Sequence, residues 1–309
     1  MQLQRTLKYP FHLEGIGLHT GNPASVAVWP GEVDSGVVFF RRDIERRKPI
    51  AAISKNVTST RLSTGIGRDG VSILTIEHLM SSLYGLGIDN AVVEVDGPEL
   101  PIMDGSAAPF VEAVVAAGIR RQEKTKRYLI IRRRVRAREG EAWAEFIPSR
   151  SFKVTCAIDF MHPIINDQEI AIEFNDAVYV KEICRARTFG FLKDVVDLRS
   201  KGFALGGSLG NAVVIDDFNV LNEEGLRYPD EFARHKLLDA LGDLALLGAP
   251  VVGHFRSYRS GHTLNQRLVR TMLERRHIFD VVSAHETARM REMLVEPPAW
   301  SEAGALTFT

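Results

Sequence analysis

The chain has 309 residues, of which 45% are hydrophobic and 25% are charged. This length suits two domains of modest size, and the composition is that of a folded globular protein. Because the 39 basic and 39 acidic residues cancel, no global field draws the chain toward nucleic acid or an anionic membrane. We therefore expect no nucleic-acid partner, and nothing in the sequence requires a protein partner.

The N-terminal residues lack the pattern of a secretion signal, because Pro10, His12 and Glu14 interrupt the position of the apolar segment. No apolar run approaches the roughly 20 residues that a membrane-spanning helix needs. The two cysteines, Cys156 and Cys184, are not closely spaced, so neither a disulfide framework nor a thiolate zinc site is indicated. We expect a cytoplasmic protein with no transmembrane segment.

The first half of the chain has the pattern of an α+β fold. Short strands with turn punctuation precede a helix that begins near Thr75, and a Val-rich strand and a second helix follow. Gly118 is placed to end that second helix. The expected elements are strands at 25–29, 36–41 and 90–96, a helix at 107–117, and a basic, apolar-poor domain boundary at 120–127.

The second half begins again with strands and then changes to helices. Its strongest helix signal starts at Pro229 and has Gly248 just past its end, as helix termini prefer. A weak repeat relates residues 78–83 to 236–241, since each segment leads through glycine into a Val-Val strand, and it suggests two similar α+β halves. The expected elements are strands at 128–135, 143–147, 152–160 and 169–174, helices at 179–187, 191–199 and 229–247, and an extended segment at 212–215.

Metal-ligand spacing occurs in the long helix, where His235 and Asp239 are four residues apart and project from one face. Asp243 extends the same row, although such a row is most often a polar surface. The first half contributes Glu77 and His78 at the start of its helix. Two histidines, one aspartate and a spare glutamate have the composition of a catalytic zinc site, which needs three protein ligands, an open position and a general base. We predict one Zn²⁺ per chain.

A third histidine, His262, lies in a Gly-punctuated loop, where functional side chains concentrate. It is either a surface residue or a second acid/base group. Amide hydrolysis needs such a group, because the amine leaving group must be protonated while water is activated.

Other motifs favour different functions. Residues 65–70 match the dinucleotide fingerprint G-x-G-x-x-G, but no apolar strand precedes them. Residues 206–210 match the nucleophile elbow G-x-S-x-G around Ser208, and Asp239 and His262 follow in the order of a serine hydrolase. A strand signal, not a helix, follows Ser208, which weakens this alternative. The ten Lys and Arg residues of 120–138 accompany only one aromatic residue, Tyr128, so a solvated strand edge is favoured over a nucleic-acid site.

Seven runs, taken together, resemble the UDP-3-O-acyl-N-acetylglucosamine deacetylases, which catalyse the committed step of lipid A synthesis in Gram-negative bacteria. The resemblance extends over roughly residues 1 to 280, and the tail beyond Ser283 lies outside it and receives no role. The runs are GIGLHT at 15–20, TIEHLM at 75–80, PIMDGS at 101–106, RARTFG at 185–190, LNEEGLR at 221–227, RHKLLD at 234–239 and SGH at 260–262.

The resemblance implies two similar domains, each a β sheet layered against two helices, with the active site between them. The implied domains are residues 1–122 and 127–283, with an insert at about 188–214 and a tail at 284–309. The implied reaction is hydrolysis of the N-acetyl group of the acylated UDP-sugar, releasing acetate and a free amine. Zinc would lower the pKa of its bound water and polarise the acetyl carbonyl.

The resemblance also implies a role for each site residue. It gives zinc to His78, His235 and Asp239, general-base work to Glu77, and acid or electrostatic work to His262, which Asp243 would orient. Thr188 would help to hold the oxyanion. Phe189 would contact the sugar, Lys236 the diphosphate and Phe160 the uridine region, and His19 is also expected at the substrate. The expected lining of an acyl-chain passage is Leu18, Leu192, Val195, Leu209 and Val214.

Overall fold

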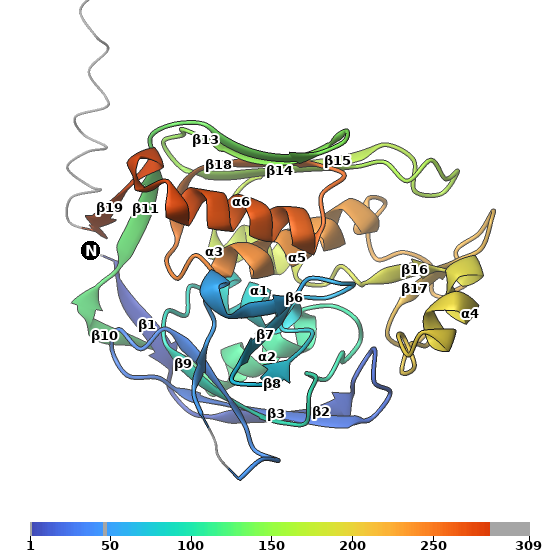
Figure 1. The fold of residues 1–309 in the computed structure, drawn as a ribbon, viewed down its shortest axis with the longest axis horizontal. Helices are drawn as coiled ribbons and strands as arrows, with labels where there is room; N and C mark the ends of the chain where they lie inside the picture. The colour runs from blue at the N-terminus through green and yellow to red at the C-terminus, as the bar shows by residue number, and fades with distance from the viewer. Residues whose placement is uncertain (1, 46–47, 285–309) are drawn as a thin grey trace, which may run out of the picture.

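The computed structural model describes residues 2–45 and 48–284. Two β sheets form the outer layers, and the main helices lie between them (Figure 1). The α+β fold class expected from the sequence is confirmed. The C-terminal tail, apart from Ala284, lies outside the described residues.

The N-terminal half contributes a five-stranded sheet in the order β2-β3-β9-β4-β5. In β9, Ala91, Val93 and Val95 are buried and alternate with less buried residues, so one face of the sheet packs on the helices. The strands of this half are β1 (Leu3–Leu7), β2 (Phe11–Ile16), β3 (Pro23–Pro30), β4 (Val37–Arg41), β5 (Ile50–Ala51), β6 (Val57–Ser59), β7 (Gly65–Arg68), β8 (Val71–Ile73), β9 (Ala91–Asp96) and β10 (Ile119–Thr125).

The C-terminal half contributes a seven-stranded sheet in which β18 pairs with β11, β13 and β14. Buried and less buried residues also alternate along strand β18, and Val251 and Phe255 face the interior. The strands of this half are β11 (Arg127–Ile131), β12 (Val135–Glu139), β13 (Ala142–Ile147), β14 (Phe152–Ile158), β15 (Gln168–Glu173), β16 (Phe189–Phe191), β17 (Val213–Ile215), β18 (Val251–Tyr258) and β19 (Phe279–Ser283).

Helices α1 (Glu77–Gly85) and α5 (Glu231–Ala245) cross at the centre of the molecule. A Cβ at Gly242 would lie 2.2 Å from the carbonyl oxygen of Glu77, so only glycine allows the backbones to approach this closely. Helices α2 (Ala108–Ala117) and α6 (His262–Glu274) complete the inner layers, and α3 is a short turn at Asp176–Val178. Each of α1 and α5 leads into a Val-Val strand, β9 or β18, as the repeat predicted.

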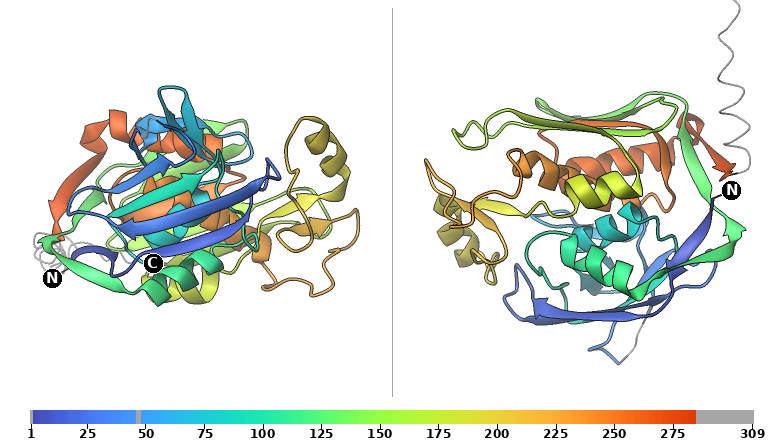
Figure 2. Two further views of the ribbon diagram at one scale, coloured as in Figure 1. Left: turned by 90° about the horizontal axis from the view of Figure 1, so that it is seen from below. Right: turned by 180° about the vertical axis from the view of Figure 1, so that it is seen from behind.

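A small unit projects from the body of the protein, and we call it the insert (residues 189–215). It consists of β16, helix α4 (Leu192–Ser200) and β17, and its two strands pair in parallel. All three views place it to one side of the layered body (Figures 1 and 2). No residue of α4 is buried, and only Val195 and Leu198 are partly covered.

Most of the expected strands and helices are present, but two predictions were wrong in detail. The strand expected at 128–135 is broken, because the backbone amides of Arg132 and Arg133 both donate to the carbonyl of Ile278. The helix expected at 179–187 is a π-helical turn, Tyr179–Ile183, because Glu231 accepts from the Arg187 amide and holds the following residues extended. The basic stretch at 120–127 is mostly strand β10, paired with β1, and its role as a domain boundary stays a prediction.

None of the helices in the described part of the chain has the length and apolar character required to cross a bilayer. The domain limits 1–122 and 127–283 stay a prediction.

Candidate active site

The three expected metal ligands meet at the crossing of α1 and α5. His78 comes from the first turn of α1, and His235 and Asp239 come from one face of α5. Their possible ligand atoms all lie within 4.8 Å of one another, and all three side chains are buried. Asp239 Oδ1 is 3.6 Å from Nε2 of His78 and 3.4 Å from Nε2 of His235. The i, i+4 spacing on α5 therefore forms a site only because α1 crosses it.

The surroundings of His235 suit a metal ligand. Its Nδ1 donates to the carbonyl oxygen of Ala186 at 3.0 Å, which leaves Nε2 with a free lone pair toward Asp239. Burial lowers the pKa of His235 to about 3, so the imidazole stays neutral, as a ligand must. Burial opposes ionisation of Asp239, but electrostatic interaction with the His235 side chain and with the charged Lys236 holds the pKa of Asp239 well below its usual range. Two neutral imidazoles and one carboxylate fit a divalent transition metal.

An acid/base pair lies beside the three ligands. Glu77 Oε1 is 3.8 Å from Nε2 of His262, the first residue of α6. Burial raises the pKa of Glu77, against the opposing effect of the neighbouring histidines. Burial would lower the pKa of His262, but the charge and hydrogen bond of Asp243 raise it to about 9. At neutral pH the site thus holds a charged imidazolium beside a carboxyl group whose pKa is raised.

Asp243 is hydrogen-bonded to His262, and the orienting role that the resemblance implied stays a prediction. Its Oδ2 accepts from Nδ1 of His262 at 3.0 Å and from Asn265 at 2.9 Å, and the pair is fully buried. Thr64 donates its hydroxyl to Asp243 Oδ1 at 2.5 Å and its amide to Glu77 Oε2 at 3.0 Å. Sequence reasoning missed Thr64 and Asn265. The position of Asn265, three residues after His262 on one helix face, was an available signal, whereas nothing local marks Thr64.

The residues expected to contact the polar part of the substrate lie around the ligands. Lys236 Nζ donates to Asp239 Oδ2 at 2.8 Å and lies 5.5 Å from the ring centroid of Phe189. Phe189 packs edge-on against both Phe160 and His235. Thr188, two residues after Ala186, donates its amide to Gly105 and is half-buried. The oxyanion role of Thr188 stays a prediction.

The residues expected to line the acyl passage lie in and near the insert, and none of them is buried. The side chains of Leu192 and Leu209 are each 48% exposed. Leu18 belongs to the loop against which the insert packs, because its carbonyl accepts from Gly206. Val195 and Val214 are partly buried. His19 is buried with its Nε2 unpaired, and its ring packs against Phe203. A continuous passage stays a prediction.

The two alternative motifs do not form the sites that they suggested. Residues 65–70 form β7 and its turn into β8, so the helix that a dinucleotide site requires is missing there. After Ser208 the chain makes a turn, in which Asn211 accepts from the Ser208 amide, and enters strand β17. Asp239 and His262, the other members of the proposed triad, are engaged with the metal-site residues instead.

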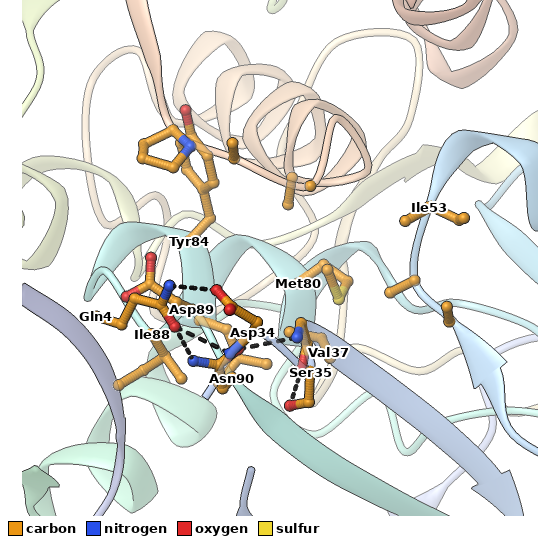
Figure 3. A pocket seen from close by; sticks show the side chains of 18 of the residues that line it. Gln4, Asp34, Ser35, Val37, Ile53, Met80, Tyr84, Ile88, Asp89 and Asn90 are labelled. Carbon is orange, nitrogen blue, oxygen red and sulfur yellow. Dashed lines mark hydrogen bonds between the residues drawn. The ribbon is translucent and has the colours of Figure 1, made fainter. Parts of the chain in front are cut away.

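A separate cavity of about 270 Å³ lies beyond the C-terminal parts of α1 and α5 (Figure 3). Its lining includes Met80, Leu83 and Tyr84 of α1, and it also includes Ala245, Gly248, Ala249 and Pro250. At its polar end, Gln4 hydrogen-bonds both Asp34 and Asn90. It includes none of the three metal-ligand residues.

A hydrolase fits these features: three buried side chains that could hold a metal, next to a carboxyl–imidazole pair, in an α+β fold. Comparison with known proteins narrows this class. The family model of the UDP-3-O-acyl N-acetylglycosamine deacetylases matches residues 4–274, and the chain belongs to this family.

Similar proteins carry the name UDP-3-O-acyl-N-acetylglucosamine deacetylase. One from Syntrophus aciditrophicus is 49% identical over 92% of this chain and 90% of its own length. One from Myxococcus xanthus is 47% identical over 99% of this chain and 96% of its own length. One from Acidithiobacillus ferrooxidans is 50% identical over 92% of this chain and 94% of its own length.

Proposed function

We propose that this chain hydrolyses the N-acetyl group of UDP-3-O-acyl-N-acetylglucosamine, giving acetate and the free amine, with Zn²⁺ held by His78, His235 and Asp239. This is the committed step of lipid A biosynthesis, and we propose that the reaction takes place in the cytoplasm. The observation that carries the proposal is the position of three buried ligands within 4.8 Å of one another beside Glu77 and His262. When bound, the metal would polarise the acetyl carbonyl and acidify the attacking water.

Glu77 is the general base in this proposal. Its raised pKa makes it a better proton acceptor than an ordinary carboxylate, and the Thr64 amide fixes one of its oxygens. As water adds to the acetyl carbon, Glu77 removes a water proton. The C–N bond then breaks, and the departing amine must receive a proton from Glu77 or His262.

His262 supplies positive charge where the oxyanion develops. Asp243 keeps the imidazole protonated at neutral pH, since it raises the pKa of His262 to about 9. The Nε2 of His262 faces Glu77, so both groups act on one small volume. Thr188 is the proposed additional donor to the oxyanion.

The polar head of the substrate would contact Lys236, Phe189, Phe160 and His19, and its acyl chain would follow the insert. Exposed apolar side chains on the insert, including Leu192 and Leu209, support this assignment, because an acyl chain would cover them. The same proposal divides the chain into domains at 1–122 and 127–283.

The direct test measures bound zinc and acetate release from the acylated UDP-sugar in the wild type and in His78→Ala. We expect His78→Ala to lose both zinc and turnover, and a chelator to abolish turnover in the wild type. Ser208→Ala should retain nearly full turnover. Activity that survives metal removal but disappears in Ser208→Ala would reject the zinc mechanism in favour of a serine hydrolase.

A further inference from the structure

Glu99 is a buried carboxylate outside the residues assigned to the site, with 1% of its surface exposed. The chain segment around Glu99, residues 98–102, is hydrogen-bonded to two different loops. On one side the amide of Leu74 donates to the carbonyl of Pro98, and on the other side the amide of Ile102 donates to the carbonyl of Ile16. Glu99 therefore lies between the loop before α1 and the loop that follows β2.

Both oxygens of Glu99 are fully used, and all the donors are uncharged. Oε1 accepts from the His19 amide and from the Thr75 hydroxyl, both at 2.9 Å. Oε2 accepts from the Thr20 amide at 2.9 Å and from the Thr20 hydroxyl at 2.8 Å. A buried carboxylate is costly unless it is hydrogen-bonded, and hydrogen bonds to a charged acceptor are strong. The carboxylate thus binds two separate loops together.

The first loop sets the start of helix α1. Thr75 has a φ of 59°, in the left-handed region where a β-branched residue is a genuine outlier. Two residues later α1 begins with Glu77 and His78. Because the conformation of Thr75 determines the direction in which α1 leaves the loop, its hydroxyl bond to Glu99 helps to place the general base and a metal ligand.

The second loop attaches the insert to the N-terminal half. The carbonyls of Leu18 and His19 accept from the amides of Gly206 and Leu205, at 3.0 and 3.2 Å. The carboxylate is packed tightly against this loop, since a Cβ at Gly17 would lie 2.3 Å from Glu99 Oε2. The position of the loop therefore decides where the insert meets the body.

We propose that Glu99 is a positioning residue that couples the start of the metal-binding helix to the attachment of the insert. The hydrogen bond between Thr75 and Glu99, which we call the Thr75 arm, positions Glu77 and His78 for the reaction. The hydrogen bonds between Thr20 and Glu99, which we call the Thr20 arm, position the insert for the acyl chain. This inference rests on the proposed deacetylase function, because it assigns the Thr75 arm to the hydrolysis step and the Thr20 arm to binding of the acyl chain.

Two isosteric variants test the Thr75 arm and the Thr20 arm separately. Thr75→Val should weaken zinc affinity and lower kcat, each by about 10- to 100-fold, as for other groups that orient metal ligands, with little change in KM. Thr20→Val should leave zinc affinity and kcat near the wild-type values and raise KM for a long-chain 3-O-acyl substrate several-fold, but not for its 3-O-acetyl analogue. Glu99→Gln should show both effects.

The measurements are zinc affinity by competition with a chelator, and kcat and KM with both substrates. Ser25→Ala is the matched control, because it removes another hydroxyl–carboxylate bond of the same half, to Asp96 at 2.8 Å. It should behave as the wild type in every assay. Midpoints of urea denaturation identify any variant that loses stability. If Glu99→Gln does not fold, Thr75→Val and Thr20→Val still test the proposed coupling.

The inference is overturned if Thr75→Val and Thr20→Val change the same parameters to the same extent, or if both behave as Ser25→Ala. Failure of the proposed function is distinguishable, since the wild type itself would then release no acetate. In that event unchanged zinc affinity in Thr75→Val would still overturn the assignment of the Thr75 arm, and weakened affinity would still support it.

Discussion

The crossing of α1 and α5 and the insert are packed in opposite ways. At the crossing, the ligands, Glu77 and Asp243 are buried, and the backbones approach so closely that Gly242 has no room for a side chain. In the insert, α4 has no residue in the core, and a Cβ at Gly190 would meet no atom within 4 Å. The proposed chemistry, which depends on fixed distances, therefore lies in the well-packed core, and the proposed contact with the acyl chain lies on the open insert. Four experiments test this contrast.

The largest expected effect is on catalysis at the crossing. Glu77→Gln keeps the shape of the side chain but cannot accept the water proton, so we expect kcat to fall by about 10²- to 10⁴-fold. Acetate release measures this, and Glu112→Gln, an exposed carboxylate on α2, should leave kcat unchanged. A fall of less than tenfold would show that Glu77 is not the base.

The next effect is on stability and compares one glycine from each region. Gly242→Ala places a methyl group against the Glu77 carbonyl and should reduce the free energy of unfolding by about 1–3 kcal/mol, the usual cost of overpacking. Gly190→Ala in the insert should change it by less than about 0.5 kcal/mol. Urea denaturation measures both values, and equal losses would contradict the difference in packing.

The third prediction concerns pH. Turnover needs ionised Glu77 and protonated His262, so the acid limb lies above the ordinary range for a carboxylate and the alkaline limb lies near pH 9. Because the Asp243 charge raises the pKa of His262, Asp243→Asn should lower that pKa and move the alkaline limb to lower pH, by about one unit or more. Asn265→Ala removes a neutral donor to the same carboxylate and should leave the limb near its wild-type position. An alkaline limb that stays in place in Asp243→Asn would exclude His262 as its origin.

The smallest effect is expected in the insert. Leu192→Ser should raise KM for a long-chain substrate by about 5- to 10-fold, because a half-exposed leucine contributes only part of the roughly 1.5–3 kcal/mol of a fully buried one. The value of kcat should not change. Val115→Ser, at an exposed position on α2, is the control, and an equal rise of KM in both variants would argue against an acyl path along the insert.

Sequence patterns predicted most strands and helices because alternation, helical periodicity and glycine punctuation are local properties. They failed where a distant group competes for the backbone. The Ile278 carbonyl breaks the strand expected at 128–135, and Glu231 stops the helix expected at 179–187. Neither interaction leaves a signal in the neighbouring sequence.

The sequence by itself determined the residue types of the site and the shared helix face of His235 and Asp239, because i, i+4 spacing is a property of any helix. Only the tertiary structure decided that His78 faces them, that Thr64 holds both Glu77 and Asp243, and that Glu99 joins two loops. These contacts depend on the close crossing of α1 and α5 and on buried hydrogen bonds between distant segments. A linear pattern cannot specify them, because burial and separation are set by the packing of the whole chain.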